Sequence, residues 1–95
     1  MSWQVGDLAV CVDGTIFPGQ RADLSPVRGK IYRVLAVYPE SEWLYDKTGV
    51  GLLVSGCFNT GNDDGQFWHG RFRKIEPAEP VFVEAMRNLR LPVDA

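Results

Sequence analysis

The sequence carries few of the residues that metal centres, disulfide scaffolds and catalytic sites need. His69 is the single histidine, and the two cysteines, Cys11 and Cys57, stand far apart along the chain. This number and spacing exclude a disulfide-rich secreted domain and a zinc site built on paired cysteines. No glycine-rich turn leads into a Lys-Ser or Lys-Thr helix start, so no phosphate-binding loop is indicated. We expect two buried thiols, no metal, no cofactor and no catalytic residue.

Long apolar runs and an excess of one charge are also missing. The first residues show no basic flank before an apolar stretch, and no segment reaches the roughly 20 apolar residues that cross a bilayer. We therefore expect a cytoplasmic protein without membrane contact. Ten basic against twelve acidic residues give a net charge of −2, which offers no general attraction to nucleic acid. Any basic surface must be local.

The residues that are present predict one small folded unit. An apolar content of 45% with 12% aromatic residues is typical of a globular chain, and 95 residues suit one domain. We expect a single domain over residues 1–95, with a barrel over 1–78 and a C-terminal helix over 79–91. The chain is expected to be a monomer or a homodimer.

Short alternating segments predict a mostly β fold. Larger residues at Leu8, Val10 and Val12 alternate with smaller ones, which indicates a strand over 7–13 with its larger residues on the core. A long polar loop follows, and then a strand over 31–38 with a bulge near Leu35, where the alternation changes parity. The strand over 31–38 is expected to resume at 43–45. The later strands cover 50–54 and 66–69, and a 3₁₀ turn at Phe72 to Ile75 leads into a short last strand.

The C-terminal segment has a different period. Apolar residues recur at helical spacing, at Phe82, Ala85, Met86 and Leu89. Pro80 suits the first position of a helix. We expect the apolar face of this helix to pack on the barrel, with another copy of the chain as the alternative.

These elements, five strands with one long first loop and a 3₁₀ turn before the last strand, fit a small SH3-like barrel best. The sequence also resembles small phage- and prophage-encoded SH3-like proteins of uncertain function, a resemblance that covers roughly residues 5 to 80. It is carried by Gly6-Asp7-Leu8, Arg28-Gly29-Lys30-Ile31-Tyr32-Arg33-Val34, Gly51-Leu52 and Gly70-Arg71-Phe72-Arg73-Lys74-Ile75. It implies the fold and a viral origin, with residence in the host cytoplasm, and transfers no binding residue.

Aromatic and basic residues gather in two segments that could bind a protein. We expect the partner-binding surface to consist of Trp43, Tyr45, Trp68, His69, Arg71 and Arg73, because aromatic and Arg side chains carry much of the energy of protein interfaces. Phe67 and Phe72 are expected in the core, and Trp68, which alternates with Phe67, on the surface. Trp43 and Tyr45 could instead pack under the first loop against Phe17. We expect a non-enzymatic module that engages a host or viral protein, for instance as an inhibitor of a defence or regulatory protein.

Two alternatives stay open. Arg28, Lys30 and Arg33 form a turn that resembles KOW-type RNA-binding modules, which favours nucleic acid. A small ligand or nucleotide signal could also be captured at an oligomer interface. The Asn59 to Gly65 run lacks the order of a Ca²⁺ loop and is expected to be a turn.

Overall fold

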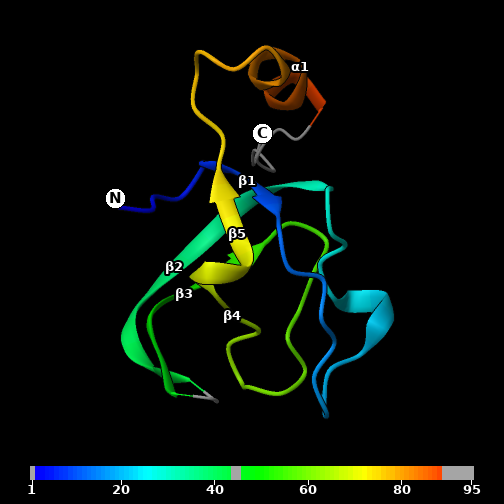
Figure 1. The fold of residues 1–95 in the computed structure, drawn as a ribbon, viewed down its shortest axis with the longest axis vertical. Coiled ribbons are helices and arrows are strands. Elements are labelled where there is room, and N and C mark those ends of the chain that lie inside the picture. The colour runs from blue at the N-terminus through cyan, green and yellow to red at the C-terminus, as the bar shows by residue number, and fades with distance from the viewer. Residues whose placement is uncertain (1, 44–45, 89–95) are drawn as a thin grey trace, which may run out of the picture.

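The computed structural model describes residues 2–43 and 46–88, which form one antiparallel sheet of five strands covered at one end by a helix (Figure 1). The sheet order is β4-β3-β2-β1-β5. The strands are β1 (Leu8–Cys11), β2 (Ile31–Trp43), β3 (Lys47–Val54), β4 (Phe67–Trp68) and β5 (Phe72–Lys74), and the helix is α1 (Val81–Asn88). The expectation of a small, mostly β domain with a C-terminal helix is confirmed.

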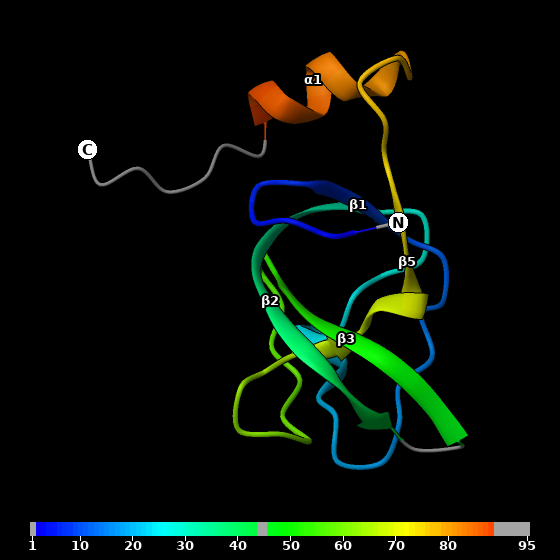
Figure 2. The ribbon, with the colours of Figure 1, turned by 90° about the vertical axis from the view of Figure 1, so that its left-hand side faces the viewer.

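Strand β2 joins the two halves of the sheet. Its first residues pair with β1, with Arg33 opposite Leu8, and the rest pairs with β3 as far as Trp43 opposite Lys47. The register shifts between Val34 and Ala36, which confirms the bulge expected near Leu35. A bulge bends its strand and increases the local twist. Figure 2 shows the resulting long, curved β2–β3 hairpin.

The main core draws its buried residues from all five strands. Phe67 and Phe72 are both buried in it, as their alternation with polar neighbours predicts. Tyr32 and Val34 share this face, which also agrees with the expected alternation of β2. The other buried members of the cluster are Ala9, Cys11, Leu52 and Val54.

Strand β1 is buried on both faces, which corrects the expectation for its larger residues. Ala9 and Cys11 face the main core, whereas Leu8 packs in a second cluster with Ile75 and Ala85. Val12, expected inside, is 44% exposed. The small residues face the crowded interior, and the larger Leu8 and Val10 meet the helix.

Helix α1 packs on its own domain, in agreement with the first of the two expectations for its apolar face. Ala85 is buried against Leu8 and Ile75, and Phe82 packs against the same cluster. The helix begins at Val81, directly after Pro80, and the part predicted beyond Asn88 lies outside the described residues. In both Figure 1 and Figure 2, α1 lies beside β1 at the end of the molecule opposite the tip of the β2–β3 hairpin.

The 3₁₀ turn before the last strand lies earlier than predicted. It spans His69–Arg71, and Phe72 already belongs to β5. The spacing of Phe72 and Ile75 has another cause: three residues apart in extended chain, they point to opposite faces, and both faces are covered. The turn was predicted too late in the chain because the three-residue spacing of these apolar residues was interpreted as one turn of a 3₁₀ helix.

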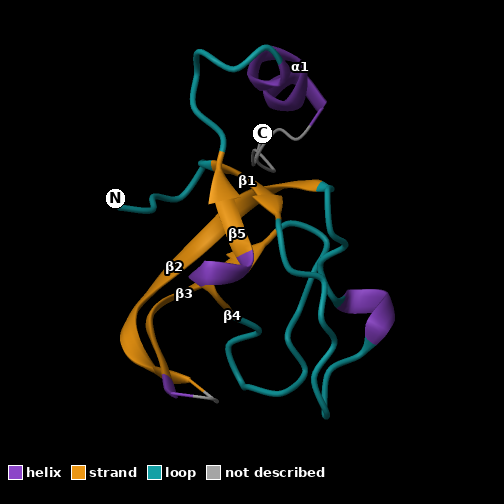
Figure 3. Cartoon of the chain, in the orientation of Figure 1, coloured by secondary structure: helices purple, strands orange, loops and turns teal. Residues whose placement is uncertain are grey.

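Two long connections run together beside the sheet (Figure 3). The segment between β1 and β2 contains a 3₁₀ turn at Ala22–Leu24, and it is joined to the β3–β4 connection by backbone and side-chain hydrogen bonds. Thr60 donates its hydroxyl to the Gly19 carbonyl at 2.6 Å and accepts from the Arg21 N–H at 3.1 Å. Across the described part of the chain, no helix has the length and apolarity required to span a membrane.

Candidate ligand cavity

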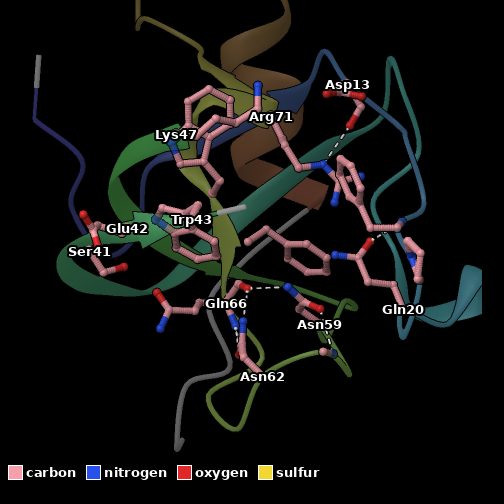
Figure 4. Close-up of a pocket in the computed structure, with 15 residues that line it drawn as sticks. Asp13, Gln20, Ser41, Glu42, Trp43, Lys47, Asn59, Asn62, Gln66 and Arg71 are labelled. Atoms are coloured by element: carbon pink, nitrogen blue, oxygen red, sulfur yellow. Dashed lines mark hydrogen bonds between the residues drawn. The ribbon is translucent and has the colours of Figure 1, made fainter. Parts of the chain in front are cut away.

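A cavity of about 530 Å³ opens between these two connections and the outer part of the β2–β3 hairpin (Figure 4). We call it the aromatic cavity. The first connection contributes Asp13, Phe17, Pro18 and Gln20, the hairpin Ser41, Glu42, Trp43 and Lys47, the β3–β4 connection Asn59, Gly61, Asn62 and Gln66, and the segment from β4 to the 3₁₀ turn Phe67, Trp68 and Arg71. Its volume lies within the range of about 300–1,000 Å³ typical of ligand pockets.

Two tryptophans of the cavity wall are held in place by β3. The Trp43 indole N–H donates to the Gly49 carbonyl at 3.0 Å, and the Trp68 indole N–H donates to the Thr48 carbonyl at 2.8 Å. The two strands that carry them flank β3 in the sheet. The Lys47 ammonium lies 4.4 Å from the centre of a Trp68 ring. Both indoles therefore have their polar group satisfied by protein and their rings fixed beside the cavity.

Glycines of β3 allow side chains to lie against the strand backbone. A Cβ atom on Gly51 would stand 1.7 Å from Gln66 Oε1 and 2.9 Å from a ring carbon of Trp43. Gly49 has a φ of +131°, and a Cβ there would stand 2.4 Å from His69 Nε2. The Gly49-Val50-Gly51 sequence thus makes room for Trp43 and Gln66 at one glycine and for His69 at the other.

Arg71 is part of the cavity wall although only 3% of it is exposed. Its Nε donates to the Asp13 carbonyl at 3.0 Å, and its Nη2 donates to the Thr15 carbonyl. The guanidinium carbon lies 5.2 Å from the ring centre of Phe67 and 5.9 Å from that of Phe17. Burial lowers the pKa of Arg71, an effect opposed by the nearby Asp13 carboxylate. Arg71 therefore fixes the first connection to the cavity wall.

The β3–β4 connection supplies a rigid side of the cavity. Asn59 and Asn62 both donate their amide N–H to the Gln66 carbonyl, at 2.9 and 2.7 Å, and Asn62 accepts from the Gln66 N–H. Asn59 also accepts from the Gly61 N–H at 2.9 Å. These side chains shape the turn that the sequence predicted here.

Two polar atoms of the wall are left without a partner. Among the described residues, Gln66 Oε1 and Arg71 Nη1 are buried side-chain atoms that form no hydrogen bond. Unsatisfied buried polar atoms are rare in native proteins because each costs about 1–3 kcal/mol. Both atoms belong to residues that line the cavity.

The structure gathers half of the predicted partner-binding residues at this cavity. Trp43, Trp68 and Arg71 line it. Trp68 is half-buried, and His69 lies against Gly49 of β3, its ring 5.3 Å from that of Trp68. Arg73 is exposed elsewhere and pairs with Glu79 at 3.2 Å. Tyr45 lies outside the described residues.

The predicted basic turn is divided between the surface and the interior. Arg28 and Lys30 are exposed, and the Lys30 ammonium lies 5.7 Å from the Tyr32 ring centre. Arg33 is only 5% exposed and donates to the Gly6 carbonyl at 2.8 Å. Arg33 is thus engaged inside the protein rather than offered to a phosphate backbone.

Several cavity residues were not singled out from the sequence. Gln20, Gln66 and Lys47 contribute polar groups, and Phe17 was considered only as a packing partner for Trp43. The sequence signal for these residues was the pair of glycines at 49 and 51. Two glycines spaced by two on one strand indicate that other groups lie close against its face. Which side chains approach it follows only from the fold.

Comparisons with protein-family models, curated proteins and solved structures gave no significant match to this chain.

Proposed function

We propose that this chain is a non-enzymatic binding module that holds an anchor side chain of a partner protein in the aromatic cavity. The observation that carries the proposal is the pair of fixed indoles, since Trp43 and Trp68 both line the cavity with their N–H groups already bonded to β3. Rings held in one conformation offer a large contact area at little entropic cost. The indoles, amides and guanidinium around the cavity are groups that bind and orient a ligand.

An SH3-like barrel is our proposal for the architecture. It is supported by the long first connection, by the 3₁₀ turn between β4 and β5, and by the shared strand β2, which pairs with β1 over one half and with β3 over the other. A bulge bends the strand that pairs with both halves of the sheet, and this curvature is what a sheet needs to close into a barrel.

We also propose a phage or prophage origin, on the strength of the sequence resemblance alone. In that setting the module would inhibit a host defence or regulatory protein by occupying one of its surfaces. Binding through a cavity suits this role, because a partner side chain held in the cavity cannot make its normal contacts.

A small-molecule ligand is the second candidate function. The observation that favours it is that the cavity is formed within one chain, without the oligomer interface expected from the sequence. Nucleic-acid binding through the basic turn is less well supported, since Arg33 is buried and bonded within the domain.

The test is selection of binding peptides from a random twelve-residue display library on the full chain. A blocking variant, Ser41→Phe, adds a ring at an exposed position of the cavity wall without removing an internal contact. Ser2→Phe adds the same ring at an exposed position that does not line the cavity. We expect selected peptides to bind wild type and Ser2→Phe alike and to lose at least tenfold in affinity for Ser41→Phe.

Peptides that bind Ser41→Phe as tightly as wild type would move the binding surface away from the cavity. Failure to enrich any peptide, together with retention of a small molecule in native mass spectrometry, would favour the second candidate.

A further inference from the structure

We propose that the group held in the aromatic cavity is the carboxylate of an acidic side chain, with Arg71 Nη1 as its donor. This inference rests on the proposed function and names the chemistry of the anchor. Arg71 has three donor nitrogens, of which Nε and Nη2 are bonded to backbone carbonyls. Nη1 has no partner among the described residues. A guanidinium donates only and accepts nothing, so the missing partner is an acceptor.

The charge of Arg71 points to an anionic acceptor. Two exposed arginines of the chain are paired with carboxylates, Arg21 with Asp23 at 2.6 Å and Arg73 with Glu79 at 3.2 Å. Arg71 is buried, yet within residues 2–43 and 46–88 it forms no such ion pair and is held by carbonyl groups alone. A buried cation that makes no direct ion pair is costly, and a carboxylate bonded to Nη1 adds such a pair to the favourable effect of the nearby Asp13 carboxylate.

Asp13, the acidic residue beside Arg71, does not supply the missing contact. It gives Arg71 its backbone carbonyl, while its carboxylate accepts from the Thr15 N–H at 3.0 Å. Lys47 is the other cation of the wall, and its ammonium lies over Trp68. The cavity therefore offers a guanidinium edge on one side and an ammonium on another.

The surroundings of Arg71 favour a carboxylate over a phosphate. The guanidinium lies close to the rings of Phe17 and Phe67, and Nη1 is its one donor nitrogen without a partner among the described residues. A carboxylate brings one negative charge and two acceptor oxygens, whereas a phosphate group brings close to two charges and three acceptor oxygens, which one free donor nitrogen does not satisfy. The aromatic walls also suit an apolar residue beside the acidic one.

A side chain must move before an acceptor reaches Nη1, because this nitrogen is closed off from solvent. Phe67 is fully buried in the main core and cannot yield without disrupting it. Phe17 is half-buried and lies on the first connection, next to the same guanidinium. Phe17 is therefore the side chain that gives way when a ligand enters. Gln66 Oε1 needs a donor rather than an acceptor and is packed against Gly51, so it does not define the anchor.

The experiment compares two probes of equal shape, acetyl-Phe-Glu-amide and acetyl-Phe-Gln-amide, by NMR titration of the full-length protein at low salt. We expect the Glu probe to bind about tenfold more tightly, the usual effect of one hydrogen bond to a charged group. It should shift the Arg71 Nε–H signal and the indole N–H signals of Trp43 and Trp68. Equal affinity for the two probes overturns the inference.

Variants that remove one positive charge show which cation binds the carboxylate. Those at Lys47 and Arg73 keep the inference testable even if Arg71→Gln does not fold. Arg73→Gln, which removes an exposed charge outside the cavity, should retain the preference for Glu over Gln, and Lys47→Gln tests the other cation of the wall. Loss of the preference in Lys47→Gln, with an unshifted Arg71 signal, would assign the carboxylate to Lys47 and overturn our inference.

A third arm separates this inference from the proposed function. Some display peptides could require an open cavity and yet bind equally well after each Glu is replaced by Gln. That result would uphold the proposed function and overturn the inference that the anchor is a carboxylate. Binding of phenylacetate, but not phenylacetamide, without binding of the Glu probe would uphold carboxylate recognition by the cavity and overturn the assignment of the carboxylate to an acidic side chain of a protein.

Discussion

Arg33 near the start of β2 donates through Nη2 to the main-chain carbonyl of Met86 in α1, at 3.3 Å. Its Nη1 lies 3.1 Å from the Met86 sulfur and 2.8 Å from the Gly6 carbonyl. The last carbonyls of a helix lack partners within the helix and carry partial negative charge. A buried guanidinium therefore ties together the sheet, the turn before β1 and the end of the helix.

Replacing Arg33 with Met should detach α1 and destabilise the whole domain. The change leaves several carbonyls unpaired and removes the support for Ala85 on Leu8, which together predict a loss of about 2–4 kcal/mol. Urea unfolding followed by tryptophan fluorescence measures it. Arg28→Met removes an exposed arginine of the same turn region and should change stability by less than about 0.5 kcal/mol. Equal effects of the two substitutions would contradict the structural role of Arg33.

Gly51→Ala should distort the aromatic cavity. The added Cβ overlaps Gln66 Oε1 and approaches the Trp43 ring, so both side chains must move, at a cost of about 1–3 kcal/mol. The tryptophan emission should shift, and the Trp43 indole N–H signal should move as its bond to Gly49 lengthens. The matched control is Gly56→Ala, where the Cβ meets nothing within 4 Å and the φ of +76° is the source of strain. An unchanged indole signal in Gly51→Ala would contradict the packing described here.

Protonation of Asp13 should lower the stability of the domain in acid. Hydrogen bonds from Thr15 are the main reason that the pKa of Asp13 is lowered from 3.8, with Arg71 adding a smaller effect. A carboxyl with a lowered folded pKa stabilises the protein above its unfolded pKa, and this contribution is lost as the pH falls through the folded value. Asp13→Asn should therefore be less stable than wild type at pH 7, and the difference should shrink below about pH 3.8.

Chemical denaturation at pH 7, 5 and 3 provides the comparison, with Glu40→Gln as a control for loss of one exposed acidic charge. A difference between wild type and Asp13→Asn that stays constant over this range would show that the carboxylate charge of Asp13 contributes nothing.

Local patterns in the sequence were sufficient for most of the strands and for the helix, because burial on one face leaves a period that neighbouring residues share. Strand β5 was the exception, since its residues were assigned to a 3₁₀ turn. The alternation around Phe67, the change of parity at Leu35 and the helical spacing of Phe82 and Ala85 each correspond to an element of the structure. Where both faces of a strand are covered, as at Leu8, the period no longer tells which residues face the main core.

The cavity and the two buried arginines were decided by tertiary structure alone. Arg71 finds its acceptors in Asp13 and Thr15, and Arg33 finds one in Met86, all more than half of the chain away. An arginine in a sequence is expected at the surface, since only the fold can bring distant carbonyls close enough to offset the loss of water around its charge. The sequence by itself therefore determined that aromatic and basic residues would cluster near β4. The tertiary structure placed Arg71 in the wall of a cavity, close to the rings of Phe17 and Phe67, with Nη1 unpartnered among the described residues.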